Sequence, residues 1–444
     1  MTIKLIEIID VKEPTGDANK LRERAWNKDL ADPTKNTISI IEEIKKEGDE
    51  ALLRLIEKYD NVKIESFVVT EKEIKEAYQS VTSSQIDTIK FMKSKLERSE
   101  QRIINNLKNM ETDSAEEEDG EDGENVKINK KVTPISRVGC YIPGGKARYP
   151  STVVMCTTPA KVAGVKQIVA ISPPMKNGKI DPFTLVAADI CGVDEFYKVG
   201  GAHGIAALAY GTKTIKRVDK IVGPGGVYVS VAKSIVSKDT AIDMIAGPTE
   251  LLIYANEKTD PQIIALDLIS QAEHSEDTIC GVVTNSNSIA KRIVEEVDKT
   301  INFGNICRKE IVKKSLNQNG FVAICDNNKK ITEFINEFAP EHLEILANNE
   351  SEILKGISNA GLILLGNYTP SSVSDYCLGS NHVLPTYRFA KSRSSLSVLD
   401  FVKIVNFVEI GNRRTLEKIA PMLREITLME GLSNHYEAAI GRIK

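Results

Sequence analysis

Nine short runs of mostly aliphatic and β-branched residues follow one another along the chain from residue 135 onward. Each run ends at glycine, proline or asparagine, and they alternate with segments that have helical spacing. This alternation is typical of parallel strands joined by crossover helices. Nine strands over more than 200 residues suit two α/β sheets better than one. The runs are SRVGCYIPGG, QIVAISPP, EFYKVGG, DKIVGPGG, ELLIYAN, ICGVVTN, FVAICDN, LEILANN and LILLGN.

The fold class predicted from this alternation is α/β, with two incomplete Rossmann-like parallel-sheet domains and small helical segments at both ends. None of the glycine-rich turns matches the G-x-G-x-x-G fingerprint. The expected boundaries are 1–33 for the N-terminal helical segment, 34–140 with 251–396 for the first domain, 141–250 for the second domain, and 397–444 for the C-terminal helical segment.

The first hundred-odd residues are predicted to be mostly helical. Apolar residues recur at helical spacing in residues 37–60 and again in 85–110. The acidic run that follows, 111–125, cannot bury enough apolar surface to pack, so we expect a mobile loop there.

Composition narrows the possible partners and the compartment. The 444 residues carry 58 basic and 62 acidic side chains, a formal charge of −4, which gives no electrostatic reason to expect nucleic acid or a membrane as a partner. The N-terminus has no signal-peptide pattern, and no apolar run reaches the roughly 18 residues of a membrane span. Seven scattered cysteines without a CxxC pair indicate reduced thiols. A cytoplasmic protein is therefore expected.

Three glycine-rich turns are candidate ligand sites, because open α/β sheets bind ligands beyond the carboxyl ends of their strands. These turns are YIPGG, VGGAHG and GPGG. GPGG, at 223–226, joins a strand to a helix and is suited to hold a phosphate on backbone donors. A tight turn that needs positive φ explains the same glycines equally well.

The segment DLISQAEHSED, 267–277, contains four carboxylates, a glutamine and one of five histidines. In a helix capped by Asp260, the side chains of Asp267, Gln271 and His274 share one face. Pro261 fits the first turn of such a helix. A solvated, charged helix end is the alternative, since no HExxH or CxxC pattern supports a metal.

Every histidine in the chain lies near a carboxylate, an amide or a glycine turn, a pattern that favours a functional site over isolated structural residues. The five are His203, His274, His342, His382 and His435.

Several motifs, in order along about residues 30–440, carry a resemblance to the histidinol dehydrogenase family. They are GCYIPGGKARYPSTVVM, VGGAHGIAALAYG, VDKIVGPGG, AIDMIAGPTE, DLISQAEH, APEHLEI, SDYCLGSNHVLPT and the terminal ME-GLSNH. The resemblance implies oxidation of L-histidinol to L-histidine, the last step of histidine biosynthesis, with two NAD and one zinc ion per site. It also implies a homodimer with shared active sites.

The resemblance implies one Zn²⁺ per subunit, held by Gln271, His274 and Asp375 and by His435 of the partner subunit. An amide oxygen among the ligands is unusual for zinc and suits a metal that orients substrate.

The same resemblance makes His342 the base for both hydride transfers and Glu341 the group that activates water for attack on the aldehyde. An imidazole is suited to repeated proton transfer near neutral pH. The two neighbours can both reach substrate only if Pro340 lies in a loop. The implied substrate-binding residues are Thr249, Gln271, His274, His342, Asp375, His382, Glu430 and His435.

For NAD, the resemblance implies contacts at Tyr141, His203 and Gly226. His203 stands where the family commonly has glutamine, and Gly226 where asparagine is common. Thr249 replaces the usual serine and keeps its hydroxyl. The resemblance assigns the metal and catalytic residues to the first domain, NAD to the second, and dimerisation to 397–444.

Three alternatives remain at this point. A related zinc- and NAD-dependent enzyme acting on another polar alcohol, such as a sulfonated diol, is one. A zinc- or nucleotide-binding protein without redox activity is another. In the third, Cys140 or Cys156 attacks the aldehyde, although neither has a neighbouring histidine or cation in sequence to lower its pKa.

Overall fold

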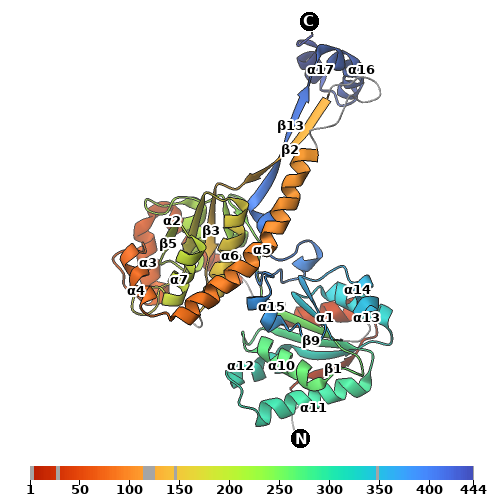
Figure 1. Cartoon of the computed structure of the whole chain (residues 1–444). Coiled ribbons are helices and arrows are strands. Elements are labelled where there is room, and N and C mark those ends of the chain that lie inside the picture. The colour runs from red at the N-terminus through yellow and green to blue at the C-terminus, as the bar shows by residue number, and fades with distance from the viewer. Residues whose placement is uncertain (1–4, 27–30, 114–125, 145–147, 347–349, 444) are drawn as a thin grey trace.

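The computed structural model describes residues 5–26, 31–113, 126–144, 148–346 and 350–443. In this part of the chain, two parallel sheets form the cores of two lobes that lie side by side (Figure 1). All nine predicted strands are present and are divided between these two sheets. The predicted α/β class with two parallel-sheet units is therefore confirmed.

The five-stranded sheet has helices on both faces. Its strands, in spatial order, are β5 (Glu195–Tyr197), β4 (Gln167–Ile171), β3 (Arg137–Tyr141), β6 (Lys220–Val222) and β7 (Ala241–Ile242). The helices α2 (Ala31–Glu47), α3 (Asp49–Asp60), α8 (Gly201–Tyr210) and α9 (Val227–Val236) cover one face. The opposite face packs against α4 (Glu71–Tyr78), α5 (Ser83–Asp113), α6 (Pro150–Ala163) and α7 (Pro182–Cys191).

The six-stranded sheet is covered in the same way. Its order is β1 (Glu7–Asp10), β10 (Gly320–Ile324), β9 (Ile279–Thr284), β8 (Glu250–Tyr254), β11 (His342–Ile345) and β12 (Leu362–Leu365). One face packs against α10 (Pro261–Ala272), α11 (Asn287–Phe303) and α12 (Lys309–Asn319). The other face packs against α1 (Pro14–Trp26), α13 (Asn328–Phe338) and α14 (Glu350–Gly356). Burial on both faces explains why these strands are almost continuously apolar in sequence.

An arm projects from the two lobes (Figure 1). It is a two-stranded antiparallel ribbon of β2 (Val126–Pro134) and β13 (Val402–Ile410), and it carries α16 (Arg413–Met429) and α17 (Ser433–Ile440) at its tip. Apolar side chains such as Val408 and Met429 are exposed on this arm. The predicted return to helix after residue 397 holds for α16 and α17 but misses β13, whose partner strand is more than 250 residues earlier.

The N-terminal segment also differs from the prediction. It contains the expected helix, α1, but residues 7–10 form an edge strand of the six-stranded sheet, paired with β10. Four residues are too few for a periodic signal, and β10 lies about 300 residues further along the chain. The predicted mobile loop at 111–125 falls largely on residues 114–125, which lie outside the described part of the chain.

The packing groups residues 31–113 with the five-stranded sheet, whereas the sequence prediction placed 34–140 with the strands of 251–396. Apolar residues of α2 and α3, including Ile41 and Leu52, pack against Val169 and Ile171 of β4. An amphipathic helix carries no local signal of which sheet it will cover. The division into domains stays a proposal, and this packing favours placing 31–242 in one domain.

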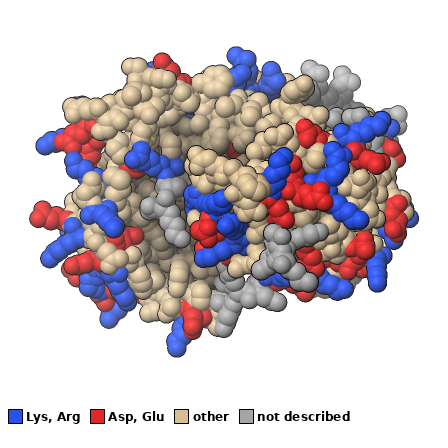
Figure 2. Space-filling view, turned by 90° about the horizontal axis from the view of Figure 1, so that it is seen from below, with Lys and Arg blue, Asp and Glu red and all other residues tan. Residues whose placement is uncertain are grey.

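Charged side chains of both signs are interspersed on the face shown in Figure 2, as the small net charge leads one to expect. Among the described residues, no helix combines the length and apolarity required to cross a bilayer.

Glu100 of α5 lies at the base of the arm. Its buried carboxylate accepts a hydrogen bond of 2.6 Å from the Val398 amide at the start of the 3-10 helix η3 (Val398–Phe401), which leads into β13. Desolvation, aided by the nearby Asp400, raises the pKa of Glu100 from 4.5 to about 7. The junction between α5 and the arm therefore contains a buried carboxyl group whose protonated form is favoured.

We predict that this junction weakens as the pH rises. Because the pKa of folded Glu100 lies above its unfolded value, its stabilisation is complete below about pH 4.5 and is lost as the pH rises through about 7. Between about pH 5 and pH 8, the unfolding free energy of the wild-type chain, measured by urea denaturation, should fall by roughly 3 kcal/mol on account of Glu100. In Glu100→Gln this fall should be absent. The exposed Glu97, on the same helix, provides the control Glu97→Gln. A pH profile unaltered by Glu100→Gln would contradict the prediction.

Candidate active site

A cavity of about 1090 Å³ lies between the two lobes. From the five-stranded sheet, it is lined by residues that follow the carboxyl ends of strands, including Pro143 after β3 and Gly225 after β6. From the six-stranded sheet, it is lined by residues at the amino ends of strands, including Thr249 before β8 and His342 at the start of β11. The expectation that ligand sites lie beyond the carboxyl ends of the strands therefore holds for the five-stranded sheet only.

Helix α10 brings Gln271 and His274 to this cavity. As predicted, Asp260 caps the helix by accepting a 2.9 Å hydrogen bond from the Gln262 amide, and Pro261 occupies the first turn. Gln271 is only 3% exposed, whereas His274 lies two residues beyond the end of the helix and is exposed, so the solvated reading fails for Gln271 but not for the residues that follow it. Asp267 does not line the cavity, and its buried carboxyl group meets that of Glu344, where desolvation raises the pKa of both.

His342 lies at the centre of the polar groups in the cavity. Its Nε2 is 3.2 Å from Oδ1 of Asp375, which is on α15 (Ser371–Cys377). Its Nδ1 is 3.4 Å from Nε2 of Gln271 and 3.7 Å from Oε2 of Glu341. All four side chains line the cavity and are at least nine-tenths buried by residue. Residues more than 100 positions apart therefore converge on one imidazole.

Burial and charge oppose each other in this group. Desolvation alone would lower the pKa of His342, but its contacts with Asp375 and Glu341 raise it well above the usual value. Desolvation raises the pKa of Glu341, although His342 and the Glu250 amide oppose the shift. For Asp375, desolvation acts upward, but the hydrogen bond to His342 leaves the pKa lowered. The protons of these three groups are thus mutually dependent.

A loop allows the neighbours Glu341 and His342 to face the same cavity. Helix α13 ends at Phe338 and is capped by Ala339, which has a left-handed backbone with φ 47°; Pro340 follows before β11 begins at His342. The Glu341 carboxylate accepts a 2.8 Å hydrogen bond from the Glu250 amide. This is the loop that the sequence required for both residues to act together.

Arg22 of α1 supports this loop from behind. Its guanidinium forms a bidentate pair with Glu250, at 2.8 and 2.7 Å, and both side chains are buried. It also donates to the carbonyl oxygens of Phe338 and Ala339. Sequence reasoning missed Arg22, because a pair 228 residues apart leaves no local pattern.

The predicted substrate residues Thr249 and His382 also line the cavity. His382 Nδ1 lies 3.0 Å from the Asp375 carbonyl oxygen. Because a carbonyl only accepts, Nδ1 must carry the proton, which leaves Nε2 as an acceptor for a ligand. Desolvation lowers the pKa of His382. Tyr149 lies within the GCYIPGGKARYPSTVVM motif and Tyr387 directly follows SDYCLGSNHVLPT; both line the same cavity but were not predicted as site residues.

Of the three predicted NAD residues, only Gly226 is among those that line the cavity. Gly226 is exposed at the cavity wall, at the N-terminus of α9. Tyr141 and His203 are buried and are not among the cavity-lining residues. The Tyr141 hydroxyl accepts a 3.3 Å hydrogen bond from the Gly201 amide, and His203 Nε2 lies 3.7 Å from Asp60.

Both interpretations of the GPGG turn apply, at different glycines. Gly223 has φ 112°, and an added Cβ would lie 2.2 Å from the Tyr141 carbonyl oxygen, so the turn itself requires glycine there. At Gly226 an added Cβ would meet no atom within 4 Å. The turn does not require Gly226, which leaves open space beside the helix N-terminus.

His435 and Glu430 do not reach the cavity of their own chain. Both are exposed on the arm, His435 on α17 and Glu430 at the end of α16 (Figure 1). Within the described residues, no cluster of three or more His, Cys, Asp or Glu is placed to hold a metal. A ligand set of one glutamine, one histidine, one aspartate and a residue from a second chain would not form such a cluster. The amide, imidazole and carboxylate facing one cavity fit a divalent cation.

All seven cysteines are free, as predicted, but none is among the described residues that line the cavity. Cys140 and Cys156 are fully buried, and desolvation raises the pKa of both thiols. Thiolate attack on an aldehyde by either residue is therefore disfavoured.

The sequence model described as histidinol dehydrogenase matches residues 24–443. The chain belongs to the histidinol dehydrogenase family. Histidinol dehydrogenase from Methanocaldococcus jannaschii is 43% identical over 411 residues, 92% of each chain. The protein of that name from Oceanobacillus iheyensis is 42% identical over 91% of each chain. A crystal structure of histidinol dehydrogenase from Elizabethkingia anophelis has a TM-score of 0.88 at 30% identity and covers 100% of this chain and 99% of its own.

These comparisons confirm the family that the motifs indicated. Membership in the histidinol dehydrogenase family makes the protein an NAD-dependent oxidoreductase, and histidinol fits it as a small-molecule substrate. The likeness extends over nearly the whole chain, so it includes both lobes and the arm.

Proposed function

We propose that the protein oxidises L-histidinol to L-histidine through histidinal, reducing two NAD in one zinc-dependent site. The observation that carries this proposal is the convergence of Glu341, His342, Gln271 and Asp375 on one cavity, in a chain of this family. Thr249, His274 and His382 line the same cavity and are the proposed substrate contacts. We expect the enzyme to work in the cytoplasm.

His342 is the proposed base in both oxidations. In the first, it takes the hydroxyl proton of the alcohol as hydride leaves the same carbon for NAD, which yields the aldehyde and NADH. Glu341 then takes a proton from water as the water oxygen bonds to the aldehyde carbon, and the proton held by His342 passes to the carbonyl oxygen, which makes His342 a base again. The hydrated aldehyde loses a second hydride to NAD and a proton to His342, which gives the acid. Two bases on adjacent residues can thus accept protons from two different groups, the substrate hydroxyl and water.

The proposed metal ligands are Gln271, His274 and Asp375, with His435 of the partner subunit. A divalent cation there would fix the amino alcohol and neutralise the Asp375 charge beside His342. The exposed apolar residues of the arm support a homodimer in which each arm completes the other site, together with Glu430 of the partner subunit. On the NAD side, Gly226 at the N-terminus of α9 suits a cofactor phosphate. The proposed contacts of NAD with Tyr141 and His203 rest on the family resemblance, since neither residue is among those that line the cavity.

The first test is NADH formation followed at 340 nm after the protein is mixed with NAD and L-histidinol. Two NADH per L-histidinol are expected. Reduction only with a sulfonated diol would favour the related polar-alcohol enzyme. Absence of reduction with either alcohol, in metal-loaded protein that binds NAD, would favour a binding protein without redox activity.

The second prediction is that turnover requires a bound divalent metal. A strong chelator should abolish NADH formation while the melting temperature changes little, because the metal orients substrate and the two sheets form without it. Adding Zn²⁺ back should restore the rate. Full activity in metal-free protein would contradict the proposed metal site.

The third prediction is that sites are shared between subunits. Neither His435→Ala nor His342→Ala should be active alone. A mixture that exchanges subunits should regain activity, because one site of each hybrid dimer then has both histidines. Mass spectrometry of the mixture confirms the exchange. Failure to recover activity in confirmed hybrids would assign His435 to its own chain or to no site.

The fourth prediction separates the two neighbouring bases. His342→Ala should slow oxidation of both histidinol and histidinal by about 10²–10⁴-fold, the usual contribution of a positioned base. Glu341→Gln should impair histidinal oxidation far more than the first hydride transfer, because water is activated only after aldehyde forms. Single-turnover rates with each substrate, with folding checked by melting, make the comparison. Equal losses at both steps in Glu341→Gln would contradict this division.

A further inference from the structure

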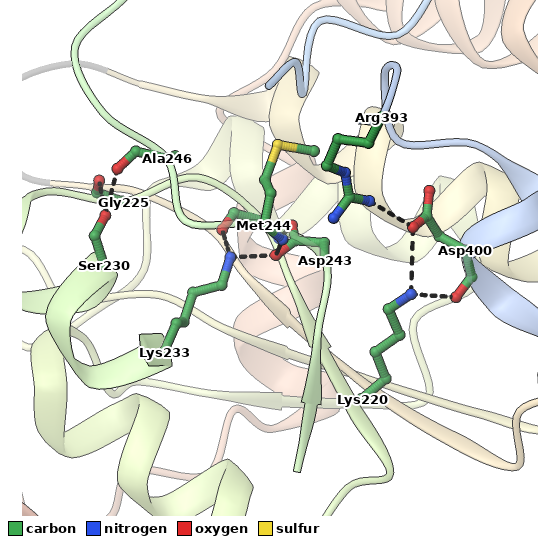
Figure 3. Close-up of polar contacts among 10 residues, drawn as sticks. Lys220, Gly225, Ser230, Lys233, Asp243, Met244, Ala246, Arg393 and Asp400 are labelled. Carbon is green, nitrogen blue, oxygen red and sulfur yellow. Dashed lines mark hydrogen bonds and ion pairs between the residues drawn. The ribbon is translucent and has the colours of Figure 1, made fainter. Parts of the chain in front are cut away.

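A second buried ion pair lies directly behind the cavity wall on the NAD side. Lys233 of α9 and Asp243, the residue after β7, are both almost fully buried, and their charged groups are in contact (Figure 3). Neither residue lines the cavity. Their polar atoms are directed at the backbone of two segments that do line it.

The first of these segments is the Gly223–Gly226 turn. The Gly223 amide donates to Asp243 Oδ2 at 2.7 Å, and the Gly223 carbonyl oxygen accepts from Lys233 Nζ at 2.9 Å. Both backbone polar groups of the turn's first glycine are therefore held by the pair. Its φ of 112° fixes the direction in which the chain continues to Gly226.

The second segment is 244–249, which connects β7 of one sheet to β8 of the other and ends at Thr249. Its first amide, that of Met244, donates to Asp243 Oδ1 at 2.5 Å. The Ser230 hydroxyl then joins the two segments, 2.6 Å from the Ala246 carbonyl oxygen and 3.5 Å from that of Gly225 (Figure 3). The same helix, α9, thus carries two of the three side chains that hold both segments.

Stability alone does not account for this arrangement. A well-packed apolar pair in place of a buried ion pair is often neutral or stabilising, so the charges need another reason to be present. Here each charged group is directed at backbone atoms, and those atoms belong to the turn beside the cofactor and to the segment beside the substrate. The pair fixes the position of one segment relative to the other.

We propose that Lys233 and Asp243 are positioning residues, which hold the Gly223–Gly226 turn and the 244–249 segment so that NAD and the alcohol meet in a reactive geometry. This inference rests on the proposed function, in which the turn contacts NAD and Thr249 contacts substrate. Hydride transfer requires close approach of donor and acceptor carbons, so a small relative displacement of the segments slows it more than it weakens either ligand.

The variants for the test are Lys233→Met, in which Asp243 keeps its two backbone donors, and Lys233→Met/Asp243→Asn, which leaves no buried charge unpaired. The matched control is Arg137→Met/Glu195→Gln. Arg137 and Glu195 pair at 2.7 Å in the same sheet, but at the amino ends of β3 and β5, away from the cavity.

Single-turnover NADH formation is measured at saturating NAD and L-histidinol, and the binding of each ligand is measured separately by calorimetry. We expect the rate at saturation to fall about 10–100-fold in both Lys233 variants, while each dissociation constant changes less than about fivefold. The control should lose melting temperature but keep its rate within about twofold.

The possible outcomes can be told apart. If the wild-type chain forms no NADH, the proposed function fails, whatever the variants do. If the wild-type chain is active and both folded Lys233 variants keep its saturated rate, the positioning role is refuted. It is also refuted if dissociation constants rise while the saturated rate is unchanged. If neither variant folds, the role is refuted as well, because the pair would then be required for the folding of the core.

Discussion

The geometry of the loop at 339–342, which brings Glu341 and His342 to the cavity, depends on one buried interaction, the bidentate pair between Arg22 and Glu250. Arg22 holds the carbonyl oxygens where α13 ends, and the Glu250 amide holds the Glu341 carboxylate. Removing one partner of such a pair typically costs about 3–5 kcal/mol, because the remaining charge is buried without compensation. The N-terminal helix α1 thereby fixes how the chain turns from α13 into β11.

That turn gives two adjacent side chains access to one cavity in different electrostatic surroundings. His342 faces two carboxylates that raise its pKa, whereas burial raises the pKa of Glu341. In a regular strand these neighbours would point to opposite faces of the sheet. The left-handed Ala339 and the following Pro340 avoid this by placing Glu341 before the strand begins. The proposed four-electron oxidation uses two proton acceptors near one carbon, and this loop gives two candidate side chains access to the same cavity.

Local patterns predicted most of the fold, including all nine strands of the sequence prediction and the capped helix that carries Gln271. They did not predict β1 or the β2–β13 ribbon, because those strands are defined by partners hundreds of residues away. For the same reason the sequence could not show that residues 31–113 cover the five-stranded sheet. At the site, motif resemblance named residues that do converge, such as His342 and Asp375. It did not indicate Arg22, whose role comes only from distant contacts.

The two sheets present opposite ends of their strands to the cavity. This difference matches the proposed division between cofactor binding at one sheet and proton transfer at the other. The carboxyl ends of the five-stranded sheet offer glycine turns and the N-terminus of α9, which suit an anionic cofactor. The amino ends of the six-stranded sheet offer side chains held by buried carboxylates, which suit proton transfer. Residues 244–249 form both the connection between the sheets and part of the cavity wall. In the proposed reaction, a shift of one lobe against the other would alter the distance between cofactor and substrate, so the proposed positioning role makes the rate of hydride transfer depend on how firmly this connection is held.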